Sequence, residues 1–382
     1  MNRRGFCSIL LLCATAQAQT QPAQTQPAQT QPAQTQPATQ PFSSLGDATR
    51  ITLKLDKVSI KEAFDRLEKQ SKIQVALAQR DLLLRNDTTI SVDFDNEPYL
   101  SALIELCRQA NLSVSTFGPR LMILASGDRR RIPPHAASGP TMIFCNALTL
   151  VHEIHFGEHD RTTATAILNF SLASEPRLPI MGLESGSTQI TAVDDHGRSL
   201  PIADTQLFRQ PQRELFNESR LFVVPLKVDP AASGTIGRLS GRVIARVVSK
   251  TEPLTIKDLL SSQGVSTTAA GTTFTVTRVE PTGAPGQFQV DLDVTSATLS
   301  SNFFARLLYN DNDFRPRMDP PGNTLQVTNA RANGDGTTIT LMVTLIPQTA
   351  GDKKPANLVW TLPSQITRVE IPFEFRGLKL HP

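Results

Sequence analysis

An internal duplication constrains the fold of this chain more than any other feature of its sequence. Residues Ile51–Val75 align without a gap on residues Ile90–Val114, 39 positions further along, and six of the 25 aligned pairs are identical. The identical pairs are Ile51/Ile90, Asp56/Asp95, Ala63/Ala102, Leu67/Leu106, Gln70/Gln109 and Val75/Val114. Five more pairs keep apolar character where a strand or a helix face requires it. We therefore expect two copies of one small supersecondary unit, packed together.

Each copy has the pattern of a strand, an amphipathic helix and a second strand. Apolar and polar residues alternate over Ile51–Leu55 and over Ile90–Phe94, which is the period of a half-buried strand. Ser59 and Glu62 then form a capping box, in which the hydroxyl accepts a hydrogen bond from a free amide at the helix start. A hairpin over residues 112–124 closes the second copy, so we expect a βαββαββ module.

The helix ends of the two copies have a recognisable form. Both helices end on Leu-x-x-Gln, at Leu67–Gln70 and Leu106–Gln109, and the second continues as Ala-Asn-Leu-Ser-Val over Ala110–Val114. With the opening strand, the capped helix and the closing hairpin, residues 49–126 resemble the short N-terminal domain of secretins and TonB-dependent receptors (the STN domain).

That resemblance implies a place in the cell and a kind of activity. In the STN family the domain lies in the periplasm and makes protein–protein contacts, ahead of an outer-membrane secretin ring or a receptor plug and barrel. Nothing after residue 126 resembles a ring domain or a long series of barrel strands. The resemblance therefore implies a partner-binding role and not transport through this chain.

Residues 1–18 have the three parts of a signal peptide. Arg3 and Arg4 supply the positive charge, Phe6–Cys13 supply a short apolar core, and Ala16-Gln17-Ala18 is a small-residue cleavage site. The apolar core favours the general secretion route, although the arginine pair also fits the twin-arginine route. We therefore expect an exported protein of the periplasm or cell envelope of a bacterium.

A low-complexity linker is expected over residues 19–48. The unit Gln-Thr-Gln-Pro-Ala recurs every five residues through Pro37, so proline interrupts backbone hydrogen bonding and there is nothing apolar to bury. This composition predicts an extended tether. Beyond it, no stretch reaches the roughly 18 apolar residues of a membrane-spanning helix, so we expect no membrane span. Association with the wall or the outer membrane stays open.

The charge balance argues against a nucleic-acid partner. The formal net charge is +3, and Arg3 and Arg4 of the expected signal peptide supply two of these charges. A nucleic-acid-binding protein needs a basic face that displaces counterions. The one short basic run, Arg129–Arg131, lies in an expected linker over residues 127–140.

After residue 140 the sequence period becomes that of β-strands. Apolar residues alternate with polar ones over Ala166–Leu172, Phe288–Val294, Ile339–Leu345 and Val369–Phe375. Short strands separated by turn residues favour β-sandwiches, and Pro253 marks a change of register. We therefore expect two sandwich domains, residues 141–253 and 254–382.

The expected fold class is α+β multidomain, a small duplicated βαβ module followed by two mostly antiparallel β-sandwich domains. The C-terminal portion also resembles β-rich exported bacterial proteins of an uncharacterised family, and this second resemblance implies no mechanism.

His152, His155 and His159 are the strongest candidates for metal chemistry. They are three of the six histidines of the chain, and zinc sites use converging neutral imidazoles. The surrounding sequence predicts a strand over Val151–Phe156, which turns His152 and His155 to opposite faces, followed by a turn at His159. We therefore expect no metal site. A metal-dependent hydrolase at the His152/His155/His159 cluster is kept only as a second alternative.

Other motifs that could carry chemistry each lack a required element. The serine of Gly182–Gly186 is one position late for a nucleophile elbow, and Asn310–Asp313 lacks the glycine and distal glutamate of an EF-hand loop. Asp194 and Asp195 belong to a predicted turn, with no second acid placed to work with them. No phosphate loop or dinucleotide motif is present. The sequence predicts no catalytic residue, metal ligand or cofactor, and a protein that is not an enzyme.

Two cysteines, Cys107 and Cys145, follow the expected signal peptide. Cys107 lies on the apolar face of a predicted helix, where it is expected to pack as a small hydrophobe. A disulfide bond between the two stays open in an oxidising compartment, although no framework pattern supports it.

These features predict a non-enzymatic envelope protein that binds another envelope protein through an exposed sheet edge or helix face of the module. Such a protein would be accessory to an outer-membrane or secretion assembly. The alternative is a glycan- or wall-binding β-sandwich protein. Sugar sites use exposed aromatic rings, and the chain has only Trp360, Tyr99 and Tyr309 besides its phenylalanines. We expect Trp360 to pack in a core, which disfavours this alternative.

Overall fold

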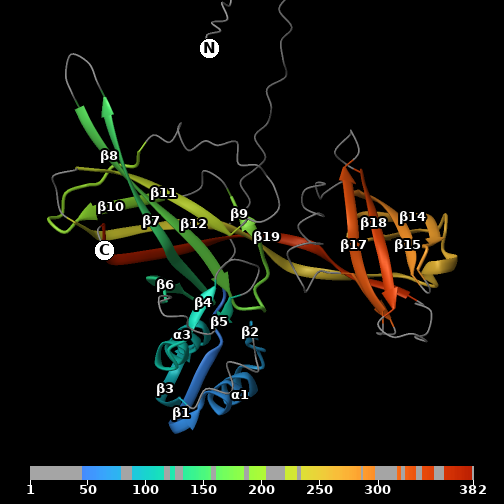
Figure 1. The fold of residues 1–382 in the computed structure, drawn as a ribbon, viewed down its shortest axis with the longest axis horizontal. Helices are drawn as coiled ribbons and strands as arrows, with labels where there is room; N and C mark the ends of the chain where they lie inside the picture. The colour runs from blue at the N-terminus through green and yellow to red at the C-terminus, as the bar shows by residue number, and fades with distance from the viewer. Residues whose placement is uncertain are drawn as a thin grey trace, which may run out of the picture. The chain divides into compact units, whose positions relative to one another are not determined.

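The chain is an α+β multidomain protein dominated by antiparallel sheets (Figure 1). The computed structural model describes residues 45–78, 88–115, 121–124, 132–155, 161–184, 189–203, 220–229, 234–284, 287–296, 316–319, 323–332, 338–347 and 357–380. The two α-helices of these residues both lie in the N-terminal module.

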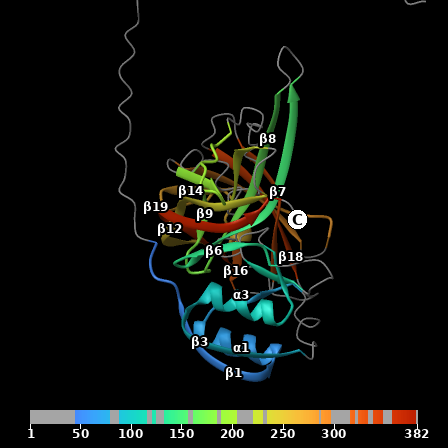
Figure 2. The same cartoon turned by 90° about the vertical axis from the view of Figure 1, so that its left-hand side faces the viewer.

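The module has the predicted order of elements. It consists of β1 (Arg50–Ser59), α1 (Ile60–Ser71), β2 (Ala76–Leu77), β3 (Thr89–Pro98), α3 (Tyr99–Gln109), β4 (Ser113–Ser115) and β5 (Met122–Leu124). Strands β1 and β3 form an antiparallel ribbon, and β2, β5 and β4 form a small mixed sheet. Both helices lie beside the β1–β3 ribbon (Figures 1 and 2).

The register of the β1–β3 ribbon follows the duplication. Lys54 lies opposite Asp93, its own counterpart 39 positions away, and the two side chains form an ion pair of 3.0 Å. The flanking pairs Leu53/Phe94 and Leu55/Val92 exchange with each other under the same 39-residue shift. The two copies are therefore related by a local two-fold axis that passes through the Lys54–Asp93 pair.

The same symmetry extends to the irregular positions of the ribbon. Each strand has one residue with a positive φ, Lys57 at 50° and Asn96 at 56°, and these are equivalent positions of the two copies. The backbone N–H of Lys57 donates to Ser91 Oγ at 2.9 Å, and that of Asn96 donates to Thr52 Oγ1 at 3.1 Å. Thr52 and Ser91 are also equivalent, so a hydroxyl of each copy satisfies the irregular backbone of the other.

The helix ends confirm part of the predicted capping. Ser59 Oγ accepts a hydrogen bond from the Glu62 N–H at 3.2 Å, which is the first half of the predicted capping box. The Glu62 carboxylate, expected to return to the helix start, pairs with Arg66 instead. Each helix is followed by a left-handed residue, Lys72 at φ 59° and Asn111 at φ 52°, again at equivalent positions. The buried faces are equivalent too, and comprise Ile60, Ala63, Phe64 and Leu67 of α1 with Tyr99, Ala102, Leu103 and Leu106 of α3.

The first sandwich has two opposed sheets. One sheet contains, in order, β11 (Leu221–Val228), β8 (Arg161–Ser174), β7 (Thr141–His155) and β6 (His135–Ser138). The other contains β9 (Ile180–Leu183), β10 (Gln189–Asp194) and parts of the long strands β12 (Thr235–Ile256) and β19 (Asn357–Lys379). Its core includes Phe170, Phe373 and Phe375, whose rings contact one another.

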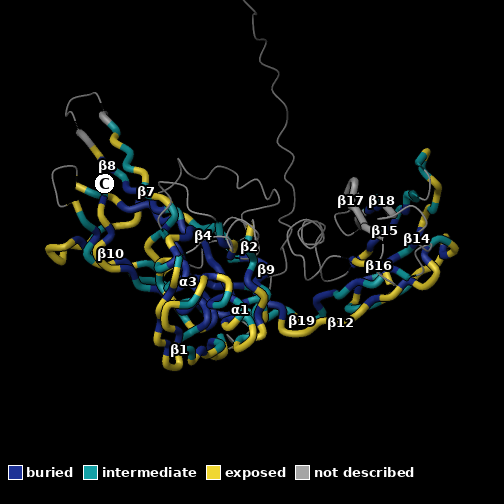
Figure 3. Tube along the Cα trace, turned by 60° about the horizontal axis from the view of Figure 1, so that its bottom comes forward, coloured by how far each residue is buried: buried dark blue, intermediate teal, exposed yellow. Residues whose placement is uncertain are grey.

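The second sandwich uses the other ends of the same long strands. Its five-stranded sheet has the order β13 (Ser266–Ala269), β14 (Thr272–Pro281), β15 (Phe288–Ser296), β18 (Thr338–Pro347) and β17 (Asn323–Ala332). Against it lie the end of β12, the start of β19 and the short strand β16 (Arg317–Asp319), with a 3-10 turn at Leu259–Ser261. Along much of β14 and β15, buried residues alternate with partly exposed ones (Figure 3).

Strands β12 and β19 form one continuous antiparallel ribbon that serves both sandwiches. The predicted boundary after residue 253 falls inside β12, and the predicted strand Val369–Phe375 pairs with β12 in the first sandwich. Neighbouring residues of β12 pack in different cores, Val247 in the first and Val248 in the second. The two cores therefore meet on opposite faces of the β12–β19 ribbon.

The two cysteines lie in different cores and are not bonded. Cys107 is buried in the module and Cys145 in the first sandwich, and both are free. Burial raises the pKa of Cys107 to about 12 and that of Cys145 to about 11. Both thiols therefore stay protonated at neutral pH.

Candidate functional site

The structure describes two of the three candidate histidines, His152 and His155, and both belong to one strand. His152 and His155 lie in β7, opposite Ala164 and Arg161 of β8, in an unbroken antiparallel register. Positions three residues apart in such a strand belong to opposite faces of the sheet. His159 lies outside the described residues.

Asp194, Asp195 and His196 form the one group of three metal-type ligands within the described ranges, with ligand atoms inside 4.8 Å of one another. The Asp194 carboxylate already accepts hydrogen bonds from the N–H groups of His196 (2.9 Å) and Arg198 (2.8 Å) and from Arg198 Nε (2.6 Å). Burial alone raises the pKa of Asp194, but these donors outweigh it and hold the pKa below its usual range. These hydrogen bonds stabilise the turn that follows β10, where the sequence predicted a turn at Asp194 and Asp195.

Two of the three aromatic candidates for sugar stacking are buried. Trp360 has no exposed surface and packs edge-on against Phe274 in the second core, with 5.2 Å between ring centroids. Tyr99 is 3% exposed in the module core. Tyr309 and the acidic run Asn310–Asp313 lie outside the described residues.

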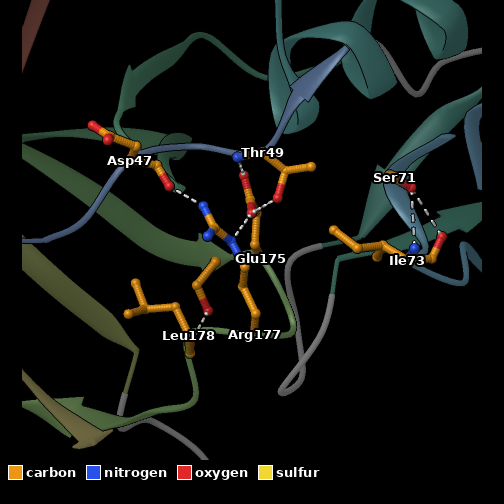
Figure 4. Close-up of polar contacts among 8 residues, drawn as sticks. Asp47, Thr49, Ser71, Ile73, Glu175, Arg177 and Leu178 are labelled. Carbon is orange, nitrogen blue, oxygen red and sulfur yellow. Dashed lines mark hydrogen bonds and ion pairs between the residues drawn. The ribbon is translucent and has the colours of Figure 1, made fainter.

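The most concentrated polar cluster of the module junction was missed from the sequence, and it centres on Glu175. The Glu175 side chain has no exposed surface. Its carboxylate accepts hydrogen bonds from the N–H of Thr49 (2.9 Å), from Thr49 Oγ1 (2.6 Å) and from Arg177 Nε (2.6 Å) (Figure 4). A buried carboxylate is stable only when such donors replace its lost water.

Local structure on both sides of the junction holds Glu175 in place. Glu175 follows β8 directly, and its N–H donates to Pro140 O at 2.9 Å while its carbonyl accepts from the Leu178 N–H at 2.9 Å. Arg177 also donates to the carbonyl of Asp47, just ahead of β1. The carbonyl of Thr49 in turn accepts the N–H of Tyr99, the first residue of α3, at 2.8 Å. A continuous set of hydrogen bonds thus connects the turn after β8 to the start of α3.

Apolar packing reinforces the same junction. Met142, Phe144 and Ala173 of the first sandwich belong to the same buried cluster as the module core. Burial raises the pKa of Tyr99, and the neighbouring Glu68 and Glu175 carboxylates raise it further. The module and the first sandwich therefore share a core.

The opposite side of the module presents an open surface. The face of the β1–β3 ribbon turned away from the helices contains Thr52, Lys54, Asp56, Ser91, Asp93 and Asp95, all exposed. We call this surface the ribbon face. These six residues carry three carboxylates and one ammonium group, and the exposed cations Arg50 and Lys57 lie on the same strand β1. Among the described residues, β1 and β3 pair only with each other, so both outer edges of the ribbon lack a partner strand.

The exposed sides of the helices are internally neutralised. Lys61 pairs with Asp65 at 2.6 Å and Arg66 pairs with Glu62, both one turn apart on α1. Glu105 and Arg108 pair at 2.6 Å on α3. Such surface pairs contribute little stability, but they neutralise these six charges locally.

Comparison with protein-family models, with curated proteins and with solved structures finds no match for the chain. Neither helix in the described part of the chain has the length and apolar character needed to cross a bilayer.

Proposed function

We propose that this chain is an exported, non-enzymatic protein of the bacterial cell envelope that binds a partner protein through the β1–β3 ribbon of its STN-like module. The single observation that carries the proposal is the pair of ten-residue strands whose outer edges lack a partner strand within the described residues. Unpaired strand edges offer N–H and C=O groups to an extended segment of another protein. The N-terminal sequence supports export, with the secretion route left open between the general and the twin-arginine pathways.

The charge of the ribbon face indicates the kind of partner. The centre of the ribbon face carries Asp56, Asp93 and Asp95 against Lys54, which favours a partner segment whose lysine or arginine side chains reach these three carboxylates. Asp56 and Asp95 are equivalent positions of the duplication, so they offer two similar acidic positions on either side of the Lys54–Asp93 pair.

The test is recovery of partners from an envelope extract with the chain from residue 19 to residue 382. The module shares its core with the first sandwich, so the isolated module is a poorer bait. Asp56→Lys combined with Asp95→Lys changes the ribbon face, and Asp65→Lys combined with Glu105→Lys makes the same charge change on the helices. We expect the first variant to lose the partner and the second to retain it. Equal recovery by both variants, or no partner above background, would count against the proposal.

A groove in the first sandwich keeps the glycan-binding alternative open. It has a volume of about 730 Å³, and its lining combines the polar residues His135, Asn146, Glu374 and Arg376 with apolar ones such as Phe375 and Leu378. The groove lacks an exposed tryptophan or tyrosine among its lining residues, so a sugar would be held by hydrogen bonds and not by stacking. Retention of the whole chain on peptidoglycan, lost in Asn146→Ala, would favour this function over partner binding.

A further inference from the structure

The outer face of the β12–β19 ribbon in the first sandwich carries a row of arginines. Arg238 pairs with Glu374 at 3.0 Å, and Arg242 pairs with Glu370 at 3.0 Å. Arg246 comes next in the row. Its neighbours in sequence, Ala245 and Val247, are buried in the first core, so the Arg246 side chain points to the same outer face as the other arginines.

Arg246 breaks the pattern of pairing. Among the described residues it has no carboxylate partner, and its Nε is buried without a hydrogen-bond partner. The residue directly opposite on β19 is another arginine, Arg368. Like charges directly opposite in a sheet destabilise it, and a buried guanidinium N–H without an acceptor adds a further penalty.

Glu184, whose carboxylate lies beyond β12 from Arg368, binds Arg368. Glu184 Oε1 accepts from Arg368 Nε at 2.9 Å, and Oε2 accepts from Arg368 Nη2 at 2.7 Å. The Glu184 N–H donates to Ile244 O at 2.9 Å, which places Glu184 beside β12 on the side away from β19. The Arg368 side chain therefore crosses over β12 next to Arg246, and the bidentate pair forms one wall beside Arg246.

The position on the other side of Arg246 has no side chain. Gly182 of β9 lies directly opposite Arg246 in the sheet. Arg246 of β12 therefore lies between Arg368 of β19 and Gly182 of β9 in the sheet. Because the glycine has no side chain, the Arg246 guanidinium has no cross-strand neighbour on that side. Arg246, Arg368 and Glu184 together carry one net positive charge.

We propose that Arg246 is the anchor of a binding site for a carboxylate ligand, bordered by the Arg368–Glu184 pair and by Gly182. The planar guanidinium matches a carboxylate in a two-bond arrangement. One bound carboxylate neutralises the net charge of the group and removes the repulsion between Arg246 and Arg368. A doubly charged phosphate fits less well, because Glu184 repels the second negative charge. The site lies in the first sandwich and does not depend on the proposed role of the module.

The probe is N-acetylglycine, added to the chain from residue 19 to residue 382, with sodium phosphate and sodium chloride at matched ionic strength. Binding to the folded state alone raises the unfolding temperature in a saturable manner. We expect a rise of about 2 °C or more at saturation with N-acetylglycine, a smaller rise with phosphate and none with chloride. Arg246→Gln should abolish the rise. Arg242→Gln, which removes a paired arginine four positions earlier, should keep it.

A second measurement separates binding from a purely structural role. Without ligand, Arg246→Gln should unfold at the same temperature as the unmodified chain or higher, because it removes an unpaired charge. A structural arginine would instead lower the unfolding temperature when replaced. The proposal is overturned by a lowered unfolding temperature of Arg246→Gln, by an undiminished response of that variant to N-acetylglycine, or by a response of the unmodified chain no larger than that to chloride. A larger rise with phosphate would overturn the assignment to a carboxylate.

Discussion

Replacing Glu175 by glutamine should loosen the module from the first sandwich. Three donors converge on this fully buried carboxylate, two from Thr49 and one from Arg177. The glutamine amide has one acceptor oxygen and one NH₂ group, so at least one donor loses its acceptor. Hydrogen bonds to a charged group contribute ~1.5–3 kcal/mol each, and a buried donor without an acceptor costs ~1–3 kcal/mol. The Arg177 side chain is half exposed and contributes less, so we expect Glu175→Gln to cost ~2 kcal/mol.

The assay is urea unfolding followed by the helical circular dichroism signal. Both described helices belong to the module, so this signal reports the part of the chain that the junction holds. Thr49→Val removes only the 2.6 Å hydroxyl bond and should cost ~1 kcal/mol. Glu280→Gln is the matched control, because Glu280 is an exposed acid paired with Arg278 and should shift the transition very little.

The ranking of the three variants decides the outcome. The junction does not depend on the buried carboxylate if Glu175→Gln unfolds at the same urea concentration as the unmodified chain. The same conclusion follows if Glu280→Gln lowers the free energy of unfolding as much as Glu175→Gln does. A larger loss in Thr49→Val than in Glu175→Gln would place the stabilisation in the Thr49 side chain and not in Glu175.

Three further outcomes follow from the structure. Cys107 and Cys145 should resist iodoacetamide at pH 8 in the folded chain, with pKa values raised to about 12 and about 11, and should react once urea unfolds it; mass spectrometry measures the labelling. The pKa of Asp194 is lowered from its ordinary value of 3.8, so its carboxylate stabilises the fold at pH values above 3.8, and this stabilisation is lost as the pH falls. Asp194→Asn should therefore lower the unfolding temperature at pH 7. Below about pH 4 the difference in unfolding temperature between this variant and the unmodified chain should become smaller. Lys57→Gly should raise stability by up to ~1 kcal/mol in urea unfolding, because Lys57 has a positive φ, and Asn96→Gly should raise it less, because asparagine tolerates this conformation.

The module could be predicted in detail because its constraints are local and repeated. The capping box at Ser59, the apolar helix faces and the order of strands all follow from patterns within one copy. The pairing of Lys54 with Asp93 could also have been found, since two copies that pack by a two-fold axis must pair equivalent residues at that axis. The hydrogen bonds of Thr52 and Ser91 to the other copy were harder to predict from the sequence, because hydroxyl residues are common on exposed strands.

The junction and the domain boundary depend on residues far apart in the chain. Glu175 binds Thr49 across 126 positions, and nothing near Glu175 in the sequence names its partner. The strand Val369–Phe375 has the same alternation whichever sandwich it joins, so sequence period alone could not assign it to the first. Arg246 likewise resembles any polar residue on a strand until its neighbour Arg368 and the pairing of Glu184 are known.

The continuous β12–β19 ribbon means that the second sandwich occupies the place of a hairpin loop. Thr235–Val248 and Ile366–Lys379 pair as the two arms of a hairpin within the first sandwich, and the chain between them builds the second. The second sandwich is therefore an insertion, one whose ends already lie at strand-pairing distance. A short turn or a different domain with closely spaced ends could take its place without rerouting any strand of the first sandwich.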